Sequence, residues 1–127
     1  MPSTRPLLLL IAPVLLFGLA ACGPRVKKED CTTWSEKAGK VTQATLSKAF
    51  PKCAAAQNVG KHGIELKQLQ CEHHVGERVD EKEVQCFLAA KTADDYGACN
   101  FKAASYFANL RDEAEGEKKA FADLCAQ

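Results

Sequence analysis

The stretch that decides the fold is CFLAAKTADDYGAC, residues 86–99. Thr92 near its middle fits the N-cap of a helix, because Asp94 and Asp95 follow in the first turn, where carboxylates stabilise the positive end of the helix dipole. A cysteine stands at each end of the stretch, several residues from this turn. Two helices that meet at a tight turn bring such positions together, so the stretch predicts a helical hairpin closed by a disulfide.

Helical signals extend from this hairpin in both directions. Upstream, Asp80 fits an N-cap with Glu83 at the third helical position, which predicts a helix that ends before the turn. Downstream, the longest helical region is expected over residues 93–124, where Gly97 and Gly116 are the positions at which it can bend or divide. Its apolar stripe consists of Ala103, Phe107, Leu110, Ala114, Phe121 and Leu124.

A first helix is predicted over residues 34–50. Thr33 and Glu36 match the pattern of a capping box at its start. Pro51 disfavours the helical conformation for the residue before it, which marks the end. The residues that share its apolar face are Trp34, Ala38, Val41 and Thr45.

Between the first helix and the hairpin the pattern is less regular. Residues 53–57 are strong helix formers in a short run. Residues 64–74 favour a helix, because Glu, Lys, Leu and Gln dominate and β-branched residues are scarce. The fold class predicted is therefore all-α, a small disulfide-stapled bundle of about four helices. The alternative is an α+β fold with a short hairpin around Gly76.

The first 21 residues have the organisation of an export leader. Arg5 supplies a positive start, and the apolar run from Leu7 to Leu19 is shorter than the roughly 20 residues that span a bilayer. The run ends at Leu19-Ala20-Ala21-Cys22, which resembles the lipobox of bacterial lipoproteins. The resemblance implies that the signal peptide 1–21 is removed and that a diacylglyceryl group is attached to the Cys22 sulfur. A transmembrane anchor and ordinary cleavage are the alternatives.

The segment after the leader is short, polar and contains Pro and Gly. Residues 22–32 are therefore expected to form a lipidated tether, and residues 33–127 a cysteine-rich helical domain. Gly23 stands where the inner-membrane retention signal of enteric bacteria has an aspartate. The expected location is therefore the cell envelope, most simply the outer membrane, facing the periplasm or the surface.

Cys22 accounts for the odd total of seven cysteines. In an oxidising compartment the remaining six predict three disulfides. Cys31 and Cys53 flank the predicted first helix, which is about 25 Å long, so they cannot pair with each other. The expected pairs are Cys31–Cys125, Cys53–Cys71 and Cys86–Cys99.

The stretch 86–99 is also similar to a helical-hairpin segment of small cysteine-rich exported proteins of deltaproteobacteria, in which a cysteine, an Ala-Lys-Thr-like turn and a closing cysteine recur. The similarity covers 14 residues. It implies a disulfide-linked all-α fold and no particular activity.

Charge and motifs narrow the classes of function. The chain has 17 Lys and Arg against 16 Asp and Glu, and loss of the leader removes one arginine, so no nucleic-acid partner is expected. No nucleophile motif stands out, and no C-x-x-C pair is present.

All three histidines lie within residues 62–74. An alternative metal site can be assembled from His62, Cys71, His74 and Glu77, at the cost of a free Cys71 thiolate.

The leading functional hypothesis is a lipid-anchored, non-enzymatic lipoprotein of the cell envelope that acts as a protein-interaction or structural module. Its membrane contact would be the lipid on Cys22, with no other cofactor, and its partner an unidentified envelope protein. One alternative is a metal-binding lipoprotein that uses His62, Cys71, His73 and His74. Another is an inhibitor or immunity-type protein. Trp34 and Tyr96 are candidate interface anchors, although core positions are the more common setting for such residues.

Overall fold

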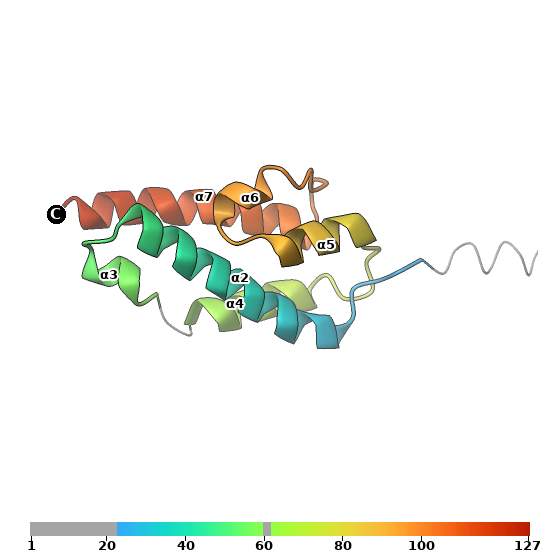
Figure 1. Cartoon of the computed structure of the whole chain (residues 1–127). Helices are drawn as coiled ribbons and strands as arrows, with labels where there is room; N and C mark the ends of the chain where they lie inside the picture. Colours follow the sequence, from blue (N-terminus) through green and yellow to red (C-terminus); the bar gives the residue numbers. More distant parts are fainter. Residues whose placement is uncertain (1–22, 60–61) are drawn as a thin grey trace, which may run out of the picture.

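The computed structural model describes residues 23–59 and 62–127, with six helices and no strand in these ranges (Figure 1). Four of the helices are longer than one turn: α2 (Lys28–Ala49), α4 (His62–Glu72), α5 (Glu81–Ala89) and α7 (Tyr106–Cys125). The short helices α3 (Ala54–Gln57) and α6 (Ala93–Tyr96) connect them. The predicted all-α class is confirmed. The signal peptide 1–21 and Cys22 lie outside the described residues.

The long helices run along one axis of the molecule, and α4 returns antiparallel beside α2 (Figure 1). The helix α7 packs against α2 and places its C-terminus at the end where α2 stops. The helix α6 packs against α7, and Phe87 of α5 meets Phe107 near the start of α7. The extended N-terminal segment therefore leaves the molecule at the end opposite to the C-terminus (Figure 1).

The prediction that residues 22–32 form a tether is wrong from Pro24 onward. The helix α2 begins at Lys28, because the Asp30 carboxylate accepts the backbone N–H of Lys27 at 3.1 Å and satisfies the first turn. The expected capping box at Thr33 is not used, and that residue lies inside the helix. Val26 is buried against the core, so this segment belongs to the folded body.

The alternative hairpin around Gly76 is also wrong. The turn that contains Gly76 (φ +89°) pairs with the N-terminal segment and not with a neighbouring strand. The backbone N–H of Val26 donates to Glu77 O at 2.9 Å, Gly76 N–H donates to Val26 O at 2.9 Å, and Val79 N–H donates to Pro24 O at 3.1 Å. The residues around Gly76 thus form an isolated antiparallel bridge with the N-terminal segment.

Asp80 caps α5 as predicted, since its Oδ1 accepts the N–H groups of Lys82 and Glu83. Glu83 does not reach back to the cap. Its side chain is buried and accepts the backbone N–H of Lys102 at 2.8 Å, which holds the loop before α7. Thr92 stands at the N-cap of α6, as predicted.

The long helix predicted over residues 93–124 is divided into α6 and α7 by residues 97–105. Asn100 and Ala104 adopt positive φ in this loop, and Ser105 starts α7 by accepting the Ala108 N–H. Phe101, which lies in this loop, is buried in the core. Gly116, in contrast, lies within an unbroken α7. Of the expected stripe, Ala103 and Leu124 are exposed.

Six aromatic rings form the centre of the core: Trp34, Phe87, Tyr96, Phe101, Tyr106 and Phe107. Phe107 lies among them, with ring centroids 4.7 Å from Phe87 and 5.0 Å from Trp34. Trp34 and Tyr96 are buried here, so they are core residues and not exposed interface anchors. Such ring pairs contribute about 0.5–1.5 kcal/mol each beyond the area that they bury.

The disulfide Cys86–Cys99 forms as predicted. The other two expected pairs, Cys31–Cys125 and Cys53–Cys71, are wrong, because the structure joins Cys31 to Cys71 and Cys53 to Cys125. The reason is the direction of α4. It returns along α2 and brings its last turn to the first turn of α2, whereas Cys53, in the segment between α2 and α3, meets the end of α7.

The helices α2 and α4 approach closely at Gly39. A Cβ at this position would lie 2.7 Å from Cγ1 of Ile64, closer than real Cβ contacts. We expect Gly39→Ala to lower the free energy of unfolding by about 1–3 kcal/mol, the usual cost of overpacking. The matched control is Gly116→Ala, which meets nothing within 4 Å and should raise stability by up to about 1 kcal/mol through helix propensity. Urea unfolding of the oxidised protein measures both. Equal stabilisation by the two substitutions would contradict the close approach.

Candidate functional site

The expected lipid attachment site adjoins a fixed part of the fold. Cys22 lies outside the described residues, and Gly23 is the one residue between it and Pro24. The three backbone hydrogen bonds between residues 24–26 and 76–79 hold this segment on the body. The Arg25 guanidinium adds a fourth contact, because its Nη1 donates to Gly76 O at 2.8 Å. A lipid on Cys22 would therefore be joined to the body with almost no linker.

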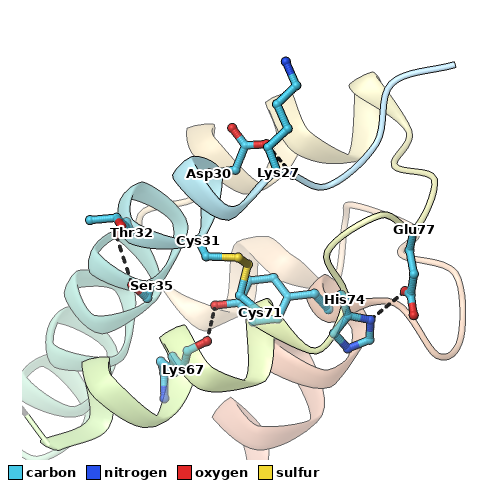
Figure 2. Close-up of a disulfide and its surroundings, with 10 residues drawn as sticks. Lys27, Asp30, Cys31, Thr32, Ser35, Lys67, Cys71, His74 and Glu77 are labelled. Carbon is cyan, nitrogen blue, oxygen red and sulfur yellow. Dashed lines mark hydrogen bonds and ion pairs between the residues drawn. A yellow bond between two sulfur atoms is a disulfide. The ribbon is translucent and has the colours of Figure 1, made fainter. Parts of the chain in front are cut away.

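The disulfide Cys31–Cys71 secures this arrangement from the inside. Both cysteines are fully buried, and their Cα atoms lie 5.4 Å apart between α2 and α4 (Figure 2). The turn that follows α4 starts two residues after Cys71, so the disulfide fixes the surface on which residues 24–26 lie.

The same disulfide removes Cys71 from the alternative metal site. Its sulfur is bonded to Cys31 and cannot act as a thiolate ligand. The structure does bring His74 and Glu77 together, with 2.7 Å between Nδ1 and Oε2 (Figure 2). His73 is exposed, and the side chain of His62 lies outside the described part. Within residues 23–59 and 62–127 no group of three or more His, Cys, Asp or Glu is arranged to hold a metal ion.

A cavity of about 260 Å³ lies where α2, α4 and α7 meet. It is lined by Gly39, Lys40, Thr42, Gln43, Val59, Gly63, Ile64, Lys67 and Glu117. Gln43 holds one wall, because its amide donates to Ala56 O and accepts the Val59 N–H. A pocket of this size and mainly apolar lining suits a small apolar group with one polar end.

The charged wall of this cavity is an ion pair between α4 and α7. Lys67 is only 5% exposed, and its Nζ lies 3.1 Å from Glu117 Oε1. The second carboxylate oxygen of Glu117 is buried without a hydrogen-bond partner. Sequence reasoning missed this pair. The available signal was the spacing of Lys67 from Cys71, since residues four apart share a helix face.

Two buried tyrosines and one aspartate have shifted acidities. Burial raises the pKa of Tyr96 and Tyr106, and the nearby carboxylates of Glu117 and Glu113 raise them further, so both phenols keep their protons. The Tyr106 hydroxyl donates to Lys67 O at 3.1 Å. Backbone N–H groups of Lys91 and Thr92 lower the pKa of Asp95. The Asp94–Asp95 pair therefore begins a helix, as expected from its position.

Large apolar side chains are exposed at several places in the described ranges. Leu66 and Leu69 lie one turn apart on α4 and are 57% and 59% exposed. Val75 follows in the turn after α4, and Leu124 lies at the far end of α7. None of the described helices is both long and apolar enough to cross a membrane.

Comparisons of the chain with protein-family models, with curated proteins and with solved structures found no match.

The ion pair at the cavity gives an asymmetric prediction. Glu117→Gln leaves the buried Lys67 ammonium without a counter-charge, so we expect a loss of about 1–3 kcal/mol in the free energy of unfolding. Lys67→Met keeps the packing of the stem and frees Glu117 Oε1, on a side chain that is one-third exposed, to bind water even though Oε2 stays buried, so the loss of stability should be smaller. Urea unfolding of the oxidised variants measures both.

The exposed pair Arg111–Asp112 serves as the control, and Asp112→Asn should change stability by less than about 1 kcal/mol. A larger loss for Lys67→Met than for Glu117→Gln would contradict the account of the buried pair.

Proposed function

We propose that this chain is a lipid-anchored, non-enzymatic lipoprotein of the bacterial cell envelope that serves as a protein-interaction or structural module. The observation that carries the proposal is the cysteine pairing. The six cysteines after Cys22 are bonded among themselves in three disulfides. They leave Cys22 as the odd cysteine, at the position where Leu19-Ala20-Ala21-Cys22 resembles a lipobox.

The disulfides also support export. Three cross-links in so small a body are typical of proteins that fold in an oxidising compartment. In the chain-entropy model the short Cys86–Cys99 loop contributes about 3 kcal/mol, and each of the longer loops contributes about 4 kcal/mol. Gly23, which is not an aspartate, supports the outer membrane as the destination in a Gram-negative cell.

A rigid helical surface supports the interaction role. Leu66 and Leu69 are exposed on α4. This helix is fixed to α2 by the Cys31–Cys71 disulfide and to α7 by the Lys67–Glu117 ion pair. Exposed apolar residues on a preorganised helix lose little entropy when a partner covers them. We propose an envelope protein as that partner. The same surface suits an inhibitor or immunity-type protein as the alternative.

The anchoring proposal is tested by Cys22→Ala in the full chain. We expect the variant to remain unprocessed or to leave the membrane fraction, because no thiol is present at the lipobox position to accept the diacylglyceryl group. Membrane fractionation and intact-mass measurement of the protein report location and acyl chains. Gly23→Ala is the control and should keep the wild-type mass increment and location. A Cys22→Ala protein that is still processed and membrane-bound would contradict the proposal.

A further inference from the structure

We propose that the folded body lies directly on the bilayer surface, through the end formed by residues 24–28 and the turn 75–79, which we call the anchor end. This inference rests on the proposed lipidation of Cys22 and adds to it the orientation of the body. The partner is the headgroup layer of the membrane that holds the lipid.

The first argument is the length of chain outside the fold. One residue, Gly23, separates Cys22 from Pro24, and a residue spans at most about 3.6 Å. The chain from Pro24 to Cys22 can therefore span at most about 7 Å. The headgroup layer of one leaflet is about 5–8 Å thick, so acyl chains in the hydrocarbon core place the anchor end among the headgroups.

The second argument is that the segment cannot detach to lengthen the linker without losing packing. Val26 is buried in the core, and residues 24–26 make three backbone hydrogen bonds to the turn that follows α4. That turn is held by the buried Cys31–Cys71 disulfide two residues upstream. The packing of residues 24–26 on the body therefore keeps the linker between Cys22 and the fold short.

The third argument is the chemistry of the anchor end. Arg25, Lys27 and Lys28 are exposed there, and the Glu29 carboxylate is exposed beside them. Two of the carboxylates nearby have partners within the body, since Asp30 accepts the Lys27 N–H and Glu77 contacts His74. Val75, 45% exposed, adds an apolar side chain at the same end. Long cationic side chains around an apolar residue suit a surface of lipid phosphates.

The opposite end of the molecule provides a matched reference. Leu124 is 50% exposed and lies beside Cys125, whose disulfide to Cys53 closes the far end of α7 and α2. Figure 1 places this end at the left, away from the N-terminal segment at the right. If the anchor end contacts the membrane, Leu124 stays in water. If the body moves freely on a long tether, both ends contact the membrane equally often.

The experiment uses the full chain made in a bacterial host that lipidates it, reconstituted in vesicles of phosphatidylcholine and phosphatidylglycerol with brominated acyl chains. Val75→Trp and Leu124→Trp each add one tryptophan to the buried Trp34, whose signal is measured in the wild type. We expect brominated lipid to quench at least half of the added fluorescence of Val75→Trp and almost none of that of Leu124→Trp. Equal quenching of the two, or stronger quenching of Leu124→Trp, would overturn the orientation.

A second variant tests the linker itself. Ten Gly and Ser residues inserted between Gly23 and Pro24 of the Val75→Trp protein leave the body unchanged and lengthen the linker to several nanometres when extended. At 0.5 M salt, where charge attraction is screened, we expect its quenching to fall by more than half. Unchanged quenching would overturn the claim that the short linker sets the orientation.

Intact mass separates this proposal from the one on which it rests. A protein without acyl chains contradicts the lipoprotein proposal. A protein that carries them but shows no preferential quenching of Val75→Trp contradicts the anchor-end contact alone.

Discussion

The buried bond between Cys31 and Cys71 is the constraint on which the arrangement of this protein depends. It joins the first turn of α2 to the last turn of α4 and thereby fixes the two helices antiparallel. That pairing requires Gly39, where a side chain would strike Ile64. It also fixes the turn after α4, which supplies the surface that receives the N-terminal segment. The chain-entropy contribution of this loop, about 4 kcal/mol, is a large part of the stability expected of a small domain.

The two ends of the body follow from this constraint and have different chemistry. The disulfide Cys53–Cys125 closes the end where α2 stops and α7 finishes. At the other end the chain enters beside exposed basic residues, directly after the proposed lipid site. Between them, α4 is tied to α7 by Lys67–Glu117 and by a hydrogen bond of 2.6 Å from Gln70 to Glu113. A body with cross-links at both ends and a polar tie in the middle presents its exposed side chains in one fixed geometry.

The features that the sequence predicts correctly are those that depend on interactions between residues close together in the chain. The hairpin Cys86–Cys99 and the cap at Asp80 depend on residues within a few turns of each other. The pairing of Cys31 and Cys53 depends on which way α4 runs, and no short-range pattern encodes that direction. The polar residues before α2 have the composition of an unstructured tether when only the sequence is considered. In the structure, the Asp30 carboxylate among them completes the first turn of a helix. At the candidate site, the sequence does not distinguish Lys67 from other lysines, and its contact with α7 makes it a buried charge.

Direct mapping of the disulfides in the oxidised protein is the most direct test of this account. Proteolysis without reduction, followed by mass spectrometry of the linked peptides, should recover Cys31–Cys71, Cys53–Cys125 and Cys86–Cys99. The alternative set with Cys31–Cys125 and Cys53–Cys71 would join residues that the structure places at opposite ends of the molecule. Recovery of that set, or of a free thiol at Cys71, would contradict the fixed α2–α4 pair and with it the proposed short connection to the membrane.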